Sequence, residues 1–512
     1  MESRTKKAAR NVAYGTVTSL LTMISSFIVR SIFIRTLGGE YIGLNSLFVN
    51  ILGIISFGEL GLGVAVTASL YKPLAEKDYA TVNAYLNFYR KFMATVGTSI
   101  IVFSIIIGPF LSMFIHGTSQ FSNVELWFYF VLFSLTSAVS YFVTYKRVVL
   151  TADQSDYINA QNNFLFTILI AITQVTILLV LKSYLLYLVI QFSLNLISNI
   201  VISRKINQRY GGIFSGPVIA LTKDNKLALK KSILGMVSAK IGGIVLTSTD
   251  SLIVSMFVGL VPLGKYANYL MITNGLTSIT NQVVNAVTPS IGNHRVNSDE
   301  NKSLQLFTTA QMLTYAIVGV FSIGMASFVE SFIRIWVGSR YELSMILVFF
   351  IVLGFYINQV RTVMTAYVTA YELFWHLRYK SIFEALLNFA SSIILAAVFK
   401  LGILSVVLGT LLANIIVNLG WEYKIVSQHG LPISAKGYFF RYITFLSSTA
   451  VILGSALGMS HFINSIYTAP VSFVIAFIVF TVSVSVWFLL IFVINPRQTK
   501  DVVNVIVRKF RR

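Results

Sequence analysis

The sequence contains no cysteine, which excludes disulfides, catalytic thiolates and zinc–thiolate sites. It is also poor in charge, because Asp, Glu, Lys and Arg together make up 11% of the 512 residues, whereas apolar residues make up 56%. A soluble domain of this length needs far more charge to cover its surface. The composition therefore predicts a membrane protein before any motif is considered.

Long polar connections are also scarce. A spanning helix needs roughly 20 mostly apolar residues, and windows of this kind predict fourteen helices. They lie at 11–36, 42–69, 92–115, 124–145, 158–181, 184–203, 232–258, 266–291, 305–330, 343–370, 381–399, 402–423, 442–460 and 467–494. The short connections leave no room for a soluble catalytic domain, and the first apolar stretch is too long for the h-region of a signal peptide. We expect an all-α, polytopic membrane fold.

Positive charge is abundant but unevenly placed. The formal net charge is +21, and with fourteen spans 30 of the 39 Lys and Arg residues fall in the termini and the even-numbered connections. Only 5 fall in the other connections. This asymmetry follows the positive-inside rule and predicts that both termini are cytoplasmic. Topology and contact with anionic lipids explain the charge, so no nucleic-acid partner is expected.

One long connection divides the chain. We expect an N-lobe of six helices at 1–210, a cytoplasmic loop at 211–231, a C-lobe of six helices at 232–423, two further helices at 424–495 and a basic tail at 496–512. A shift of 225 residues superposes Gly39-Glu40-Tyr41 on Gly264-Lys265-Tyr266, and each tripeptide joins a first helix to a second. Lobes of six helices point the same way, as in parallel transporter repeats that enclose a central cavity.

Six charged residues within the expected spans are interpreted as charges that should not be in contact with lipid. They are Arg30, Arg35, Glu59, Lys240, Asp250 and Arg361. A charge near the bilayer centre costs about 2.5–3.5 kcal/mol and normally faces a cavity or a partner. Four cations against two carboxylates leave an excess of positive charge, and a guanidinium matches phosphate oxygens well. We therefore expect an anionic, phosphate-bearing substrate.

Structural explanations of the same charges stay open. Arg35 lies about one residue from the outer end of its predicted helix and can snorkel to the interface. Glu59 can form a buried ion pair with one of the arginines, and Asp250 can pair with Lys240. In these cases the charges stabilise packing and bind neither substrate nor ion.

Polar residues recur at helical spacing beside these charges and draw a stripe along five helices. The stripes contain Thr18, Thr22, Ser26, Ser56, Thr247, Asn274, Ser278, Asn281, Asn285, Asn358 and Thr365. A hydrated cavity between the lobes is the simplest place for them. Hydroxyl and amide side chains also serve as hydrogen-bonding contacts between helices, which accounts for a share of this set.

The sequence offers little for catalysis. Gly259–Tyr266 imitates a phosphate-binding loop, but Tyr266 replaces the required Ser or Thr and the segment lies on the expected outer side. We interpret it as a turn. The five histidines are scattered, and no nucleophile–base arrangement is present. We therefore expect neither an enzyme nor a bound metal or cofactor.

Several segments resemble signatures of one transporter family. Ile34–Leu44 is similar to the helix-one to helix-two signature of the polysaccharide transporters. These are the oligosaccharide-lipid (Wzx-like) flippases of the multidrug/oligosaccharidyl-lipid/polysaccharide (MOP) exporter superfamily. Ser56–Gly63 and Tyr71–Ala75 resemble the versions found with capsule and exopolysaccharide genes of Gram-positive bacteria. Thr249–Ser255 followed by Gly264–Tyr266 resembles the helix-seven to helix-eight signature, so the resemblance covers essentially the whole chain.

This resemblance implies a fold of twelve core helices plus two in the bacterial cell membrane, working by alternating access. The implied activity moves an undecaprenyl-diphosphate-linked oligosaccharide from the inner to the outer leaflet, driven by the membrane potential or by antiport of H+ or Na+. Diphosphate binding would fall to Arg30, with Arg35, Lys240 and Arg361 matching the family pattern less closely. Related flippases couple ions through intramembrane carboxylates, for which Glu59 and Asp250 are the only candidates that the sequence indicates.

The implied partners are the lipid-linked oligosaccharide, membrane lipids and the polymerase or glycosyltransferase machinery of polysaccharide synthesis. Two related functions stay open, namely a MATE-type multidrug–cation antiporter and a flippase for lipid II. A polysaccharide polymerase is a third alternative, but such enzymes usually carry a large outer loop, and the outer connections here are short.

Overall fold

The computed structural model describes residues 4–56, 62–117, 120–214, 221, 248–297, 300–371 and 373–494. Within these residues the chain is helical and contains no β-strand. For some helical residues, Asn285 among them, only the backbone is described. Many of the helices have membrane-spanning length and composition, so the predicted all-α, polytopic class is confirmed.

Ten helical stretches in the described part of the chain are long and apolar enough to cross a membrane. They comprise α4 (Tyr79–Ile107) with η2 (Gly108–Phe114), α5 (Asn123–Ala152), α6 (Tyr157–Val180), α7 (Tyr184–Phe214), α10 (Glu300–Trp336), α11 (Met345–Val360) with α12 (Thr362–Ala370), α13 (Lys380–Ala397), α14 (Leu404–Ala413) with η5 (Asn414–Asn418) and α15 (Leu419–His429), α16 (Ala435–Ile466) and α17 (Ala469–Ile494). Each corresponds to a predicted span.

Three more helices coincide with predicted spans: α1 (Arg4–Leu37), α2 (Gly39–Ile55) and α9 (Leu260–Asn297). The predicted span at 42–69 contains most of α2 and also the first part of a short helix, α3 (Leu62–Ala75). The predicted span at 232–258 lies mostly outside the described residues.

Helix ends follow the local sequence. Asp78 caps α4 by accepting a hydrogen bond from the Thr81 N–H at 3.1 Å, and Ser122 with Glu125 forms a capping box at the start of α5. Such caps satisfy amide groups that a helix start leaves without partners. Gly38, with φ of 92°, allows the sharp turn between α1 and α2, because this backbone conformation favours glycine.

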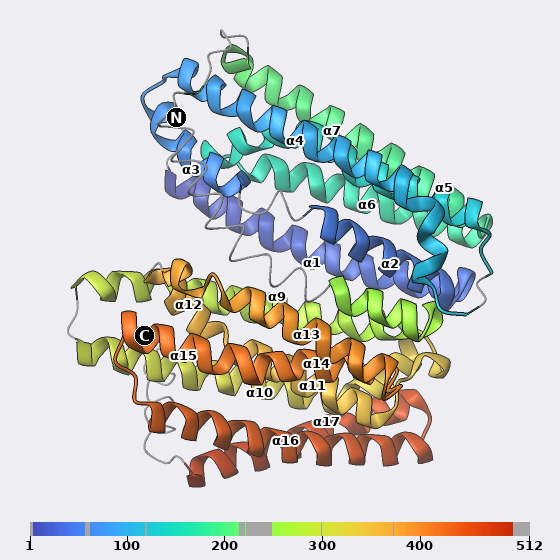
Figure 1. Ribbon diagram of the computed structural model, residues 1–512, viewed down its shortest axis with the longest axis vertical. Coiled ribbons are helices and arrows are strands. Elements are labelled where there is room, and N and C mark those ends of the chain that lie inside the picture. Colours follow the sequence, from blue (N-terminus) through green and yellow to red (C-terminus); the bar gives the residue numbers. More distant parts are fainter. Residues whose placement is uncertain are drawn as a thin grey trace. The chain divides into compact units, whose positions relative to one another are not determined.

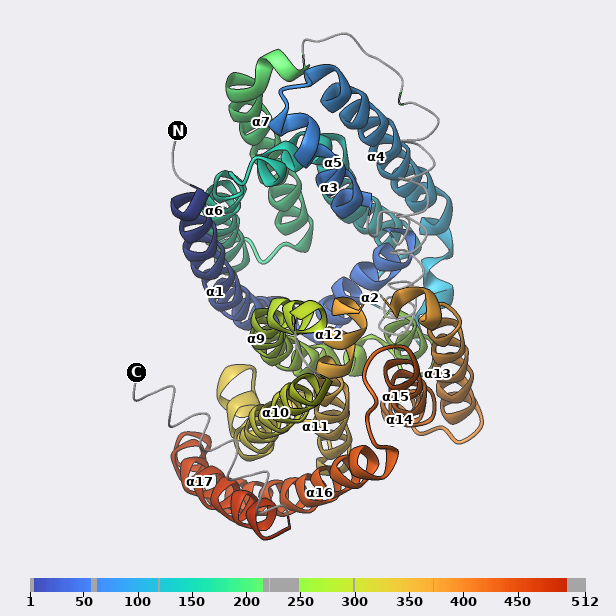
Figure 2. The same cartoon turned by 90° about the vertical axis from the view of Figure 1, so that its left-hand side faces the viewer.

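The chain divides into two compact units, Met1–Gly264 (unit 1) and Lys265–Arg512 (unit 2). In unit 1, α1 packs on α6, α6 on α7, and α5 on both α4 and α7 (Figure 1). In unit 2, α10 packs against α16 and α17, and α13 packs against α14 (Figure 2). The predicted lobe boundaries stay a prediction, because residues 215–220 and 222–247 lie outside the described part.

Gly43 of α2 and Gly264 of α9 lie at a close helix crossing in unit 1. A Cβ on Gly43 would lie 2.0 Å from the backbone oxygen of Leu260, and a Cβ on Gly264 would lie 2.5 Å from the backbone oxygen of Gly39. Glycine at these positions lets the two backbones touch, which any larger residue prevents. Gly39 and Gly264, the corresponding positions of the 225-residue repeat, are thus in direct contact.

Gly43→Ala is expected to destabilise the protein by about 1–3 kcal/mol, because the new Cβ must displace backbone and not a flexible side chain. The change is measurable as a lower unfolding temperature of the purified protein in detergent. Gly458→Ala in α16 is the matched control, since nothing lies within 4 Å of a Cβ at that position. Equal stability of the two variants would contradict the close crossing.

In unit 2, the predicted spans at 343–370 and 402–423 are not continuous α-helices. The span at 343–370 is interrupted at Arg361, between α11 and α12. The span at 402–423 contains the π-helical turn η5 and continues as α15 to His429. Turns of this kind redirect side chains and are frequent at functional sites. Both irregularities contribute to one polar cluster.

Candidate functional site

A cluster of charged residues is buried inside unit 2 at these two irregularities. The guanidinium of Arg361 forms a two-pronged ion pair with Glu422 of α15, with Nε 3.1 Å from Oε2. Lys380, the first residue of α13, lies 2.7 Å from the same carboxylate and 3.4 Å from that of Glu384. All four residues are buried. Two cations therefore face two carboxylates, and the cluster as a whole is neutral.

Two asparagines of η5 complete this charged cluster. Asn414 Oδ1 accepts hydrogen bonds from Arg361 and from Asn418 Nδ2, the latter at 2.8 Å. Asn418 also donates to Glu384, and Asn358 accepts a longer bond from Arg361 at 3.4 Å. Charged groups withdrawn from water need this combination of opposite charge and hydrogen bonds.

The cluster corrects the sequence-based list of intramembrane carboxylates. Glu384 and Glu422 both lie in membrane-length helices and are buried. The prediction that Glu59 and Asp250 are the only such carboxylates is therefore wrong. A signal was available, because Lys380 and Glu384 are spaced for an ion pair on one helix face.

Arg361 was predicted to bind a diphosphate, and in the structure its guanidinium contacts Glu422. Its predicted role in diphosphate binding stays a prediction, since a diphosphate would have to compete with Glu422 for the guanidinium. Thr365, predicted to line a cavity, is exposed, and its hydroxyl donates to the Thr362 carbonyl at 2.8 Å.

Unit 1 contains a related arrangement. Arg147 of α5 donates to Asn163 Oδ1 at 3.2 Å and to Asn199 Oδ1 at 3.0 Å. Arg361 and Asn414 follow Arg147 and Asn199 by 214 and 215 residues, so an arginine–asparagine pair recurs in both halves. Within the described residues Arg147 forms no ion pair with a carboxylate. In both halves an arginine is hydrogen-bonded to an asparagine, but only Arg361 is also paired with a carboxylate, that of Glu422.

Arg30 is half-buried on α1, beside polar groups of α6 and α7. Its charge acts on the phenol of Tyr187, which also hydrogen-bonds Gln174. The Gln174 amide donates to Gln191 Oε1 at 3.4 Å, and the Tyr187 ring stacks on Tyr184 with centroids 6.0 Å apart. These neighbours could not be predicted from the sequence, because neutral polar residues in apolar helices are usually packing contacts.

The residues of the predicted polar stripe on α1 differ in their surroundings. Thr22 and Ser26 are exposed, whereas Thr18 donates to the Ala160 carbonyl of α6 at 3.4 Å and so links two helices. Arg35 is exposed in the last turn of α1, the position from which an arginine can snorkel.

The remaining predicted residues are not brought into one site by the described structure. Asn274, Ser278 and Asn281 are exposed on α9, Asp250 is buried, and Ser56 is half-buried at the end of α2. Glu59, Lys240 and Thr247 lie outside the described residues, as does the side chain of Asn285. Their roles stay predictions. In the described part, no group of His, Asp and Glu is arranged to hold a metal ion.

No protein-family model matches the chain, and no curated protein matches it in sequence.

The fold does match solved transporters. The lipid II flippase MurJ, in an inward closed conformation, aligns with a TM-score of 0.66 at 16% identity over 93% of this chain and 99% of that chain. An inward-facing multidrug resistance MATE family transporter of the MOP superfamily aligns with a TM-score of 0.58 at 14% identity over 79% and 95%. A mutant of the Vibrio cholerae MATE transporter VcmN aligns with a TM-score of 0.53 at 15% identity over 83% and 98%. The chain therefore has the fold shared by the flippase MurJ and the MATE transporters of the MOP superfamily.

Proposed function

We propose that the chain is a flippase for an undecaprenyl-diphosphate-linked oligosaccharide repeat unit. It would move this lipid from the inner to the outer leaflet of a bacterial cell membrane for capsule or exopolysaccharide synthesis. Basic side chains bind the diphosphate, the sugars occupy a hydrated cavity, and the prenyl tail stays in lipid. Alternating access of two repeats carries the headgroup across.

The surroundings of Arg30 carry this proposal. In unit 2, Arg361 and Lys380 are balanced by two carboxylates, so that cluster adds no net charge. Arg30 lies within the helix α1, where its charge acts on Tyr187, and Tyr187 in turn contacts the amide of Gln174. A guanidinium binds phosphate oxygens in a two-pronged geometry, and phenol and amide groups bond sugar hydroxyls. Such a combination suits the junction of a diphosphate and its first sugar.

The length of the fold supports a flippase over a drug antiporter. The alignment with MurJ covers 93% of this chain. The alignments with the two MATE structures cover only 79% and 83% of this chain, although they cover 95% and 98% of the MATE chains. A MATE-sized fold thus leaves roughly a fifth of the chain unmatched. The two helices predicted beyond a twelve-helix core agree with this surplus.

The membrane potential can drive the proposed transfer. Moving one charge across 100 mV is worth about 2.3 kcal/mol, so outward transfer of a diphosphate with two negative charges gains about 4.6 kcal/mol from an inside-negative potential. Antiport of H+ or Na+ through Asp250 or Glu59 adds to this drive. Glu384 and Glu422 are unsuited to that task, because each is already paired with a buried cation.

Arg30→Gln is expected to reduce polysaccharide export by about tenfold or more, because a hydrogen bond between charged groups contributes about 1.5–3 kcal/mol. The measurement is surface polysaccharide in a deletion strain complemented with each variant, normalised to membrane abundance, together with the lipid-linked intermediate that accumulates in the cell. Ile28→Ala, at an exposed position on the same helix, should export normally. Normal export by an abundant Arg30→Gln variant would refute the assignment.

Two alternatives have support from the fold comparison. The likeness to MurJ favours a lipid II flippase, and the likeness to MATE transporters favours a multidrug–cation antiporter. Restored growth of cells depleted of their own lipid II flippase would support the first. Dye efflux that depends on a cation gradient would support the second. Restored surface polysaccharide with neither of these activities supports the proposal.

A further inference from the structure

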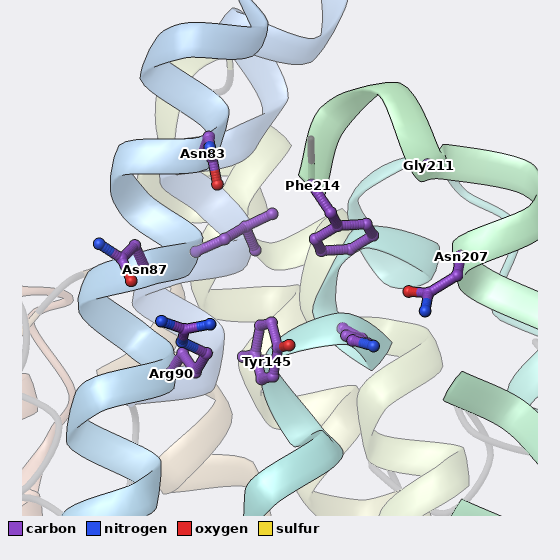
Figure 3. Close-up of a pocket in the computed structure, with 9 residues that line it drawn as sticks. Asn83, Asn87, Arg90, Tyr145, Asn207, Gly211 and Phe214 are labelled. Carbon is purple, nitrogen blue, oxygen red and sulfur yellow. The ribbon is translucent and has the colours of Figure 1, made fainter. Parts of the chain in front are cut away.

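A basic pocket of about 310 Å³ lies in unit 1 between α4, α5 and α7 (Figure 3). Arg90 of α4 and Lys146 of α5 line it, and none of the described residues that line it is acidic. The surrounding helix ends are those that the distribution of Lys and Arg predicts to be cytoplasmic. The pocket has no role in the proposed transport of the lipid-linked oligosaccharide.

Aromatic and hydroxyl groups hold the two cations of the pocket in place. Arg90 Cζ lies 6.0 Å and Lys146 Nζ 5.8 Å from the ring centroid of Tyr145. Lys146 Nζ also lies 5.8 Å from the ring centroid of Phe214 and donates to Ser203 Oγ at 2.8 Å. These contacts orient the cations without neutralising them, so two like charges face the same space. An anion between them would remove that repulsion.

A kink in α7 lies beside the pocket. The backbone leaves helical geometry at Tyr210, with φ of −124° and ψ of 21°, and the following turn carries Phe214 over Lys146. Gly211 forms part of the wall, and a Cβ there would meet nothing within 4 Å. The Tyr210 hydroxyl donates to Asp153 Oδ2 at 2.7 Å, which fixes the kink and engages this carboxylate outside the pocket.

Three amide side chains also line the pocket. Asn83 and Asn87 come from α4 and Asn207 from α7 (Figure 3), and Asn83 is only 6% exposed. A guanidinium and an ammonium in a polar pocket are a combination that binds phosphate. The volume lies at the lower end of the range for small-molecule sites, which fits a headgroup and excludes a whole lipid.

We propose that this pocket binds a phosphate group, with an anionic phospholipid of the cytoplasmic leaflet as its source. Basic pockets between membrane helices on the cytoplasmic side commonly hold such headgroups. A soluble phosphate compound has the same chemistry and is the alternative source. The site lies wholly within unit 1 and does not depend on which substrate the protein transports.

The test measures lipid binding to the purified full chain in detergent by native mass spectrometry. Phosphatidylglycerol is the probe, phosphatidylcholine is the neutral lipid, and inorganic phosphate at constant ionic strength is the soluble competitor. Arg90→Gln and Lys146→Gln are each expected to weaken phosphatidylglycerol binding roughly tenfold. Gly211→Leu fills the pocket without changing charge and should cause a similar loss.

Lys91→Gln is the matched control, because it removes a charge from the exposed residue next to Arg90 that does not line the pocket. It should change binding less than twofold, and Arg90→Lys should retain most binding, which shows that the fold survives substitution there. Competition by inorganic phosphate would identify the phosphate group alone as sufficient, and its absence would identify the lipid headgroup. Equal binding to all variants, or an equal loss with Lys91→Gln, would overturn the proposal.

Discussion

Glu422→Ala is expected to lower the free energy of unfolding by about 3–5 kcal/mol, the usual effect of removing one member of a buried ion pair. The variant leaves the guanidinium of Arg361 and the ammonium of Lys380 buried, with Glu384 as the remaining carboxylate of the cluster. A buried charge without its partner has lost its hydration, and no opposite charge compensates for that loss. Denaturant unfolding in detergent measures the effect, and membrane abundance gives a readout in cells.

Two further variants make this result specific. Arg361→Met combined with Glu422→Leu removes both members of the pair and leaves Lys380 beside Glu384, so most of the lost stability should return. Glu76→Ala breaks an exposed ion pair with Lys72 and should cost less than about 1 kcal/mol. If Glu422→Ala were as mild as Glu76→Ala, the cluster would have to be hydrated.

Trp487→Ala is expected to destabilise unit 2 by about 3–5 kcal/mol, as truncation of a buried tryptophan generally does. Trp487 of α17 is fully buried, and its Nε1 donates to Thr449 Oγ1 of α16 at 3.0 Å. Its ring fills the space above Gly319 of α10, where a Cβ would lie 2.3 Å from the ring. Truncation opens a cavity among three helices and removes a buried hydrogen bond.

Unfolding in detergent together with limited proteolysis of α16 and α17 measures this loss of packing. Phe488→Ala is the control, since the neighbouring side chain is 40% exposed and should matter little. Gly319→Ala should also destabilise, because the tryptophan ring leaves no room for a methyl group. A Trp487→Ala variant with normal stability and normal protease resistance would show that α17 docks by other contacts.

The positions of the helices were largely predictable, because a bilayer requires a minimum apolar length and that length is visible in the sequence. The predicted span at 158–181 and α6 at Tyr157–Val180 differ by only one residue at each end. The interruption at Arg361 and the π-helical turn η5 were not predictable in this way. They depend on which side chains meet across helices, and a hydropathy window contains no such information.

The sequence indicates which charged residues lie within the spans, but it does not indicate which residues they contact. Arg361 was identified from its place in a span, yet its partner Glu422 lies near the end of another span, where a carboxylate looks terminal. Arg147 was placed in a connection because the predicted span stopped at residue 145. In the structure α5 continues through Ala152, and Asn163 and Asn199 of neighbouring helices accept hydrogen bonds from the guanidinium.

The Arg361–Glu422 pair also constrains biogenesis. The two residues are separated by 61 positions, so the arginine is synthesised and enters the bilayer first. At about 5–20 residues per second, the ribosome needs roughly 3–12 s to deliver the glutamate. During that interval the nascent segment must remain at the translocon or hold a temporary counter-ion. Chains truncated between the two residues should be short-lived substrates of membrane quality control.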